Sequence, residues 1–195
     1  PLVDGKLCIV HVGHDRDGAM IAFDADTGRP QWEYDGDGPG YGSPIIATLA
    51  GKRQIVTPVS KFVAGIDILN GQVLWREPFP THSTQNVITP LQHRDLIITG
   101  GIGQPTVALR PGQGKVETEV ERIWENKEVS LHMSSPVLLE GKLFGLSRAK
   151  SGHLFCLDPD TGETLWQGEG RLAKYAAVLA VGNLLAILTS DGTLI

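Results

Sequence analysis

The 195-residue sequence contains only two cysteines, Cys8 and Cys156, and they lie far apart. Neither belongs to a CxxC pair or to a set with metal-ligand spacing, so the cysteines predict neither a zinc site nor a redox pair. We interpret them as two small buried residues on different strands of different repeats.

Long apolar runs, basic stripes and helical periodicity are missing as well. No apolar run reaches the roughly 18 residues of a membrane-spanning helix, so this segment is not expected to span a membrane. Lysine and arginine are interspersed with acidic residues at a formal net charge of -5, which argues against a nucleic acid partner. Helix formers never gather into an amphipathic stretch, whereas 24 glycines and 12 prolines indicate many turns. This composition predicts an all-β fold.

One pattern recurs three times without a gap. A small residue is followed by Asp two positions later, by Gly four positions after Asp, and by Trp four positions after Gly, over residues 22–32, 65–75 and 156–166. A degenerate copy begins at Ala108, carries Arg110 in the Asp position and reaches Trp124 late. The four tryptophans are 43, 49 and 42 residues apart. The long interval predicts an insertion of about six residues between Gly112 and Thr118.

Each repeat is predicted to form four short strands separated by turns. In the second repeat they cover 43–48, 54–59, 63–68 and 73–77; in the fourth they cover 134–139, 143–147, 153–157 and 164–167. We expect Gly28, Gly71 and Gly162 to take a positive φ, and the nearby Asp or Thr to bond the amides of the turn.

A repeat of 42–49 residues with four strands is typical of a blade of a β-propeller. One sheet cannot bury both of its faces, and the large indole is expected to fill the gap between neighbouring blades. The predicted segments are 1–39 (partial blade), 40–80 (blade), 81–128 (blade with insertion), 129–170 (blade) and 171–195 (partial blade). We therefore expect a piece of a propeller, about four to five blades of seven or eight.

The repeat resembles the tryptophan-docking motif of the pyrroloquinoline quinone (PQQ)-like propellers along essentially the whole chain. The resemblance implies that each indole is sandwiched between blades. The third repeat departs from the family pattern at Arg110 and at the insertion, so the docking of Trp124 stays open. The motif residues that it covers are Ala22, Asp24, Gly28, Trp32, Asp67, Gly71, Trp75, Trp124, Cys156, Asp158, Gly162 and Trp166.

A possible binding site is expected where the innermost strands begin. The Ser/Thr-Pro pairs at 43–44, 89–90 and 135–136, with their counterpart at 177–178, align Asn86, His132 and Lys174 four residues before the proline position. Tyr41 and Tyr175 occupy the next position in their repeats. The starts of the innermost strands converge on one face of a propeller, at the mouth of its central channel. The residues there are predicted either to bind a small molecule or peptide or to be ordinary solvated loop residues.

Other polar groups are interpreted as turns. The segment 15–18 alternates carboxylates and ends in Gly, as calcium loops do, but it lacks the bidentate Glu and lies where a hairpin is needed. The six histidines have no shared ligand spacing beyond His11 and His14. No metal or cofactor is therefore predicted from the residues.

Two functions remain open on the sequence. The first is a non-catalytic, periplasmic or otherwise extracytoplasmic platform that binds a protein or an envelope component. The second, implied by the same resemblance, is a dehydrogenase that oxidises an alcohol or sugar with PQQ and calcium. Quinoprotein alcohol dehydrogenases often carry an adjacent cysteine pair, which is missing here. No residue of this chain is assigned to catalysis or to the cofactor.

Overall fold

The computed structural model describes residues 1–14, 17–112, 119–149 and 152–195. The chain divides into two compact units, which are described separately. Unit 1 contains Pro1–Thr89 and Pro111–Glu121, and unit 2 contains Pro90–Arg110 and Arg122–Ile195. Asp15, Arg16 and most of the predicted insertion lie outside the described residues.

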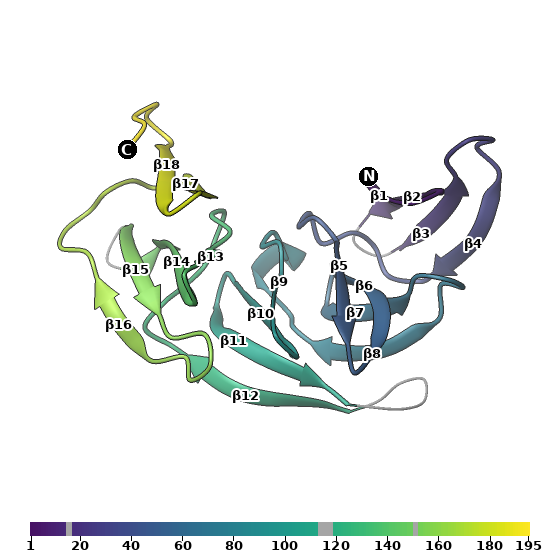
Figure 1. Cartoon of the computed structure of the whole chain (residues 1–195), viewed down its shortest axis with the longest axis horizontal. Helices are drawn as coiled ribbons and strands as arrows, with labels where there is room; N and C mark the ends of the chain where they lie inside the picture. Colours follow the sequence, from purple (N-terminus) through teal and green to yellow (C-terminus); the bar gives the residue numbers. More distant parts are fainter. Residues whose placement is uncertain (15–16, 113–118, 150–151) are drawn as a thin grey trace. The chain divides into compact units, whose positions relative to one another are not determined.

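The strands form antiparallel sheets in which sequence neighbours pair (Figure 1). The four four-stranded sheets and the two-stranded one contain, in chain order: β1 (Leu2–Asp4), β2 (Leu7–His14), β3 (Asp17–Asp24) and β4 (Pro30–Asp35); β5 (Ile45–Leu49), β6 (Lys52–Pro58), β7 (Phe62–Asp67) and β8 (Val73–Pro78); β9 (Leu91–His93), β10 (Leu96–Gly101), β11 (Gln104–Pro111) and β12 (Val120–Asn126); β13 (Val137–Leu139), β14 (Lys142–Ser147), β15 (His153–Leu157) and β16 (Thr164–Gln167); and β17 (Ala176–Val181) and β18 (Leu184–Thr189). A 3-10 turn, η1 (His82–Thr84), lies between β8 and β9. The all-β prediction of four-stranded antiparallel blades is confirmed.

The innermost strands begin later than predicted, and proline explains the difference. β5 begins at Ile45 rather than at residue 43, and β13 begins at Val137 rather than at residue 134. Each follows directly on the proline of its Ser-Pro pair, Pro44 or Pro136. Because proline has no N–H, it cannot donate to the ladder and marks the edge of the strand.

In three sheets, the hairpin after the third strand (β3, β7 or β15) is closed by an Asp side chain and a glycine. Asp158 Oδ1 accepts hydrogen bonds from the backbone amides of Asp160 (2.8 Å) and Thr161 (3.1 Å), and the Gly162 amide donates to the Asp158 carbonyl (2.8 Å). Gly162 has a φ of 74°. Asp24 and Asp67 close their turns through the same glycine contact, with φ of 69° at Gly28 and 74° at Gly71.

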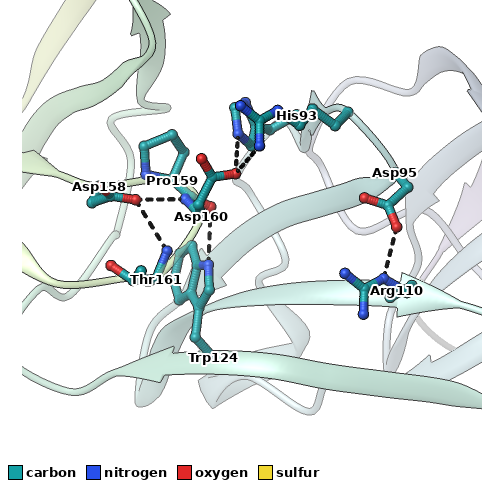
Figure 2. A network of polar contacts seen from close by, with 9 residues as sticks. His93, Asp95, Arg110, Trp124, Asp158, Pro159, Asp160 and Thr161 are labelled. Carbon is teal, nitrogen blue, oxygen red and sulfur yellow. Dashed lines mark hydrogen bonds and ion pairs between the residues drawn. The ribbon is translucent and has the colours of Figure 1, made fainter.

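Two tryptophans reach across from one sheet to the hairpin of the next. In unit 1, Trp32 of β4 donates from Nε1 to the Ile68 carbonyl (3.0 Å) and lies against Gly71, where an added Cβ would come within 2.7 Å of the indole. In unit 2, Trp124 of β12 donates to the Pro159 carbonyl (3.0 Å; Figure 2), and a Cβ on Gly162 would lie 2.5 Å from its ring. Trp124 therefore contacts a hairpin of the next sheet as Trp32 does, although its repeat carries Arg110.

Trp75 departs from this arrangement and contacts its own sheet. Its Nε1 donates to Gln54 Oε1 in its own sheet (2.6 Å), and the indole covers Gly65, its cross-strand neighbour. A Cβ at Gly65 would lie 2.0 Å from Trp75 Nε1, so only glycine allows this position. Beside it, a cavity of about 70 Å³ is bounded by Trp75, Gln54 and Pro111, the residue that follows Arg110.

The third repeat also reverses the charges of an ion pair. In unit 1, Lys52 at the start of β6 pairs with Asp67 at the end of β7 (2.8 Å). In unit 2, Asp95, which precedes β10, pairs with Arg110 of β11 at the corresponding strand ends (2.7 Å; Figure 2). Arg110 in the Asp position is thus matched by an acidic residue in the Lys position.

The apolar core lies between sheets in each unit. In unit 1, residues that alternate along the strands form one cluster: Ile9, Met20, Ala22, Trp32, Tyr34, Ile55, Ile66 and Ile68. In unit 2, Leu146 packs with Ala173, Ala176, Val178 and Ile187. Trp166 of β16 is 50% exposed. Among the described residues, no helix is long and apolar enough to cross a membrane.

Candidate ligand-binding site

The residues predicted to surround the channel mouth fall into both units. Tyr41 precedes β5 and Asn86 precedes β9, and both belong to unit 1. His132 precedes β13, while Lys174 and Tyr175 precede β17, and these three belong to unit 2. Each group is therefore considered by itself.

The unit 1 residues have different environments. Tyr41 is exposed and has a positive φ of 73°. Asn86 is only 2% exposed, and its Nδ2 donates to the carbonyls of Val59 (2.7 Å) and Phe79 (3.0 Å). Its own carbonyl accepts the Gly42 amide (2.9 Å). The Asn86 side chain therefore joins backbone segments, and both of its amide hydrogens are used within the unit.

The unit 2 residues come together around a fourth side chain, Arg148, which follows β14. The rings of His132 and Tyr175 meet edge to face with centroids 5.3 Å apart. Lys174 Nζ lies 5.2 Å from the Tyr175 ring centroid. Arg148 Nη1 donates to His132 Nδ1 and lies 3.5 Å from Tyr175 Oη. We call His132, Arg148, Lys174 and Tyr175 the basic cluster.

Backbone hydrogen bonds hold the segments of the basic cluster in place. The Arg148 amide donates to the Ser130 carbonyl (2.8 Å), and the Ser130 amide donates to Ser147 Oγ (3.1 Å). The Ala176 amide donates to Ser134 Oγ (2.9 Å), which ties the start of β17 to the segment that carries His132. Serine side chains thus fix the backbone on both sides of the cluster.

The protonation state of His132 follows from its neighbours. A guanidinium has donors only, so Nδ1 of His132 must be the acceptor and the proton of the neutral ring lies on Nε2. Burial lowers the pKa of His132 below its ordinary value, and the charges of Arg148 and Lys174 lower it further. His132 is therefore neutral near pH 7 and orients the guanidinium.

The two cations of the basic cluster have no carboxylate partner among the described residues. Within the described part of the chain, Arg148 and Lys174 make no salt bridge, and both charges that act on the His132 pKa are positive. Arginine and lysine donate hydrogen bonds and accept none. The arrangement is therefore suited to bind an anion.

Sequence reasoning identified three members of the basic cluster and missed Arg148. The prediction considered only the entrances to innermost strands, whereas Arg148 follows the second strand of its sheet. Its position directly after the predicted strand 143–147 was the available signal, because a second strand that runs antiparallel to the first ends where the first begins.

The 15–18 segment and the histidines are the residues considered from the sequence as metal ligands. Asp17 and Gly18 begin β3, whereas the first half of the supposed calcium loop lies outside the described residues. His11 Nε2 contacts the Asp37 carbonyl (2.8 Å), and His153 Nδ1 contacts the Ala149 carbonyl (2.8 Å). In the ranges that the structure describes, no group of three His, Cys, Asp or Glu side chains could hold a metal ion.

Comparisons with known proteins agree with the propeller architecture. The family model described as outer membrane protein assembly factor BamB matches residues 1–168. Quinoprotein ethanol dehydrogenase of Pseudomonas aeruginosa is 26% identical over 153 residues, which cover 75% of this chain and 19% of that protein.

Solved structures show the same fold. BamB from Moraxella catarrhalis superposes with a TM-score of 0.67 at 21% identity, over 96% of this chain and 56% of that one. A europium-containing methanol dehydrogenase superposes with a TM-score of 0.59 at 15% identity, over 88% of this chain and 44% of that one. The chain thus spans about a fifth of the matched dehydrogenase sequence and little more than half of the BamB chain.

Proposed function

The chain belongs to the family described as outer membrane protein assembly factor BamB, and from this premise we propose that it is part of a non-catalytic interaction platform. The platform binds a protein or another envelope component outside the cytoplasm. The family match supports both the protein partner and the extracytoplasmic, periplasmic location.

The chemistry of the basic cluster is the observation that carries this proposal. A dehydrogenase site needs a group that removes a proton from the alcohol, with a free lone pair near the substrate. In the cluster, Arg148 and Lys174 only donate, and the Nδ1 lone pair of His132 is already occupied by Arg148. These groups suit recognition of a ligand better than proton abstraction.

The likeness to quinoprotein ethanol dehydrogenase favours a second candidate function, PQQ- and calcium-dependent oxidation of an alcohol or sugar. The cations of Arg148 and Lys174 fit the carboxylates of PQQ, which would supply the two-electron oxidation when bound. The described residues contain no group of three acidic or histidine ligands for the calcium. Under this alternative, the calcium ligands come from elsewhere in the protein.

A calorimetric titration of the full protein that contains this chain, with PQQ in the presence of calcium, separates the two functions. We expect no saturable heat of binding from a platform. One-to-one binding tighter than about micromolar that disappears when calcium is chelated would establish the dehydrogenase instead. Addition of calcium without PQQ is the control for heat from the metal alone.

A further inference from the structure

We propose that the basic cluster is a carboxylate-recognition site for an acidic segment of a protein partner. This inference rests on the proposed platform function and names the chemistry of its partner. It is carried by the side chains of His132, Arg148, Lys174 and Tyr175, which three separate segments of unit 2 bring together.

The Arg148 guanidinium is held through Nη1, and its other N–H groups can donate hydrogen bonds to a ligand. Its Nη1 contacts His132 Nδ1 and Tyr175 Oη, and its Nε and Nη2 make no hydrogen bond to any described residue. The side chain is exposed. A planar guanidinium with its remaining N–H groups free matches the two oxygens of a carboxylate. Contact with the neutral ring fixes its direction before the ligand arrives, which reduces the entropy lost on binding.

Lys174 supplies the second positive charge. Its Nζ stays exposed over the face of Tyr175, 5.2 Å from the ring centroid, and it makes no other polar contact within the described ranges. Tyr175 is half-buried and carries a hydroxyl that can donate outward. The cluster therefore offers two charges and a neutral donor to an incoming anion.

The surroundings favour a polypeptide carboxylate over a more highly charged anion. The chain has a net charge of -5, so a polyanion such as nucleic acid is repelled by the rest of the surface. Two cations match one or two carboxylates of a partner. Arginine, tyrosine and methionine are enriched in protein interfaces, and Met133, next to His132 in the chain, is 50% exposed.

Fluorescence anisotropy with the full protein tests this assignment. The probe is a fluorescein-labelled six-residue peptide with two adjacent glutamates among glycines and serines, and the same peptide with both glutamates replaced by glutamine is the control. We expect the acidic peptide to bind more tightly, and Arg148→Gln to weaken its binding roughly tenfold because a charge-assisted hydrogen bond is lost. Arg148→Lys should also weaken binding, because lysine keeps the charge but cannot donate two parallel hydrogen bonds to one carboxylate. Added salt should weaken binding in parallel.

Lys142→Gln is the matched control, because it removes one exposed positive charge at the opposite end of the strand that leads to Arg148. It should change the affinity less than about twofold, as expected of a distant surface charge. Equal weakening by Lys142→Gln and Arg148→Gln, or equal binding of both peptides, would overturn the proposal. Displacement of the peptide by free glutarate or inorganic phosphate at peptide-like concentrations would overturn the polypeptide assignment. If the acidic peptide does not bind and PQQ does not bind either, only the carboxylate-recognition proposal is refuted. Calcium-dependent binding of PQQ would refute the platform function itself.

Discussion

Trp124 and Trp75 occupy the same position of the repeat, yet they contact different parts of the fold. Trp124 crosses to the hairpin of the following sheet and donates to Pro159, while Trp75 turns back to Gln54 of its own sheet. The hairpin that receives Trp124 is regular, closed by Asp158 and Gly162. The comparison teaches that two features determine the position of an indole. One is the hairpin of the following sheet, and the other is the residue opposite the tryptophan on the neighbouring strand, which is Gly65 for Trp75.

Replacing an indole is expected to have the largest effect. Trp124→Ala should lower the free energy of unfolding by about 3–5 kcal/mol, because a large buried side chain leaves a cavity. It should also speed hydrogen exchange in the Asp158–Gly162 hairpin, since that hairpin loses its cover. Trp75→Ala should leave exchange in this hairpin unchanged. Urea unfolding followed by circular dichroism, with exchange mass spectrometry, checks both; equal exchange in the two variants would contradict the assigned contacts.

A methyl group added to the receiving hairpin should have the next largest effect. Gly162→Ala places a Cβ 2.5 Å from the Trp124 ring at a φ of 74°, so we expect a loss of about 2–4 kcal/mol from overpacking and backbone strain. Gly141→Ala has the same strain at a φ of 72° but meets nothing within 4 Å. It should cost only about 1 kcal/mol. Similar melting temperatures for the two variants would mean that the Trp124 ring does not pack closely against Gly162.

The Trp75 contact should be sensitive to its hydrogen bond. Trp75→Phe leaves the buried Gln54 Oε1 without its donor, and we expect a loss of about 1–3 kcal/mol beyond that of the smaller ring. The second change Gln54→Leu should recover part of it, because it removes the unpaired acceptor. The same Gln54→Leu combined with Trp124→Phe should recover nothing. A double-mutant cycle in urea that gives no coupling between Trp75 and Gln54 would refute the contact.

The two groups of mouth residues differ in their response to pH, and this effect should be the smallest. Asn86 does not titrate, whereas His132 has a lowered pKa caused by burial, Arg148 and Lys174. The unfolded chain binds this proton more readily, so stability falls as the pH drops below about 6.5 toward the folded pKa of His132. In His132→Asn, the melting temperature should fall less between pH 7.5 and 5.5.

His11 in unit 1 also has a pKa lowered by burial, so the wild-type chain should keep part of its pH dependence when His132 is replaced. The difference between the two profiles therefore isolates His132. Identical profiles would show that burial and the charges of Arg148 and Lys174 do not lower the pKa of His132 in the folded chain.

Much of the fold could be predicted because its signals are local. The alternation of turns and apolar segments placed most strand ends within a few residues, and the innermost strands began later only where proline removed a donor. The candidate site was predicted less completely. Asn86 and His132 align in the repeat, yet one ties backbone segments together and the other orients an arginine.

By itself, the sequence determined the four-stranded repeat and the closed hairpins, because an Asp and a glycine four residues apart satisfy the turn through contacts within it. Only the tertiary structure decided which residues accept the hydrogen bonds of the indoles, and that His132 contacts Arg148 and Tyr175. Those contacts join segments distant along the chain, such as Trp75 with Gln54 and Arg148 with Tyr175. Their geometry depends on the space left by a neighbour, as Gly65 leaves it for Trp75, and no local pattern encodes that space.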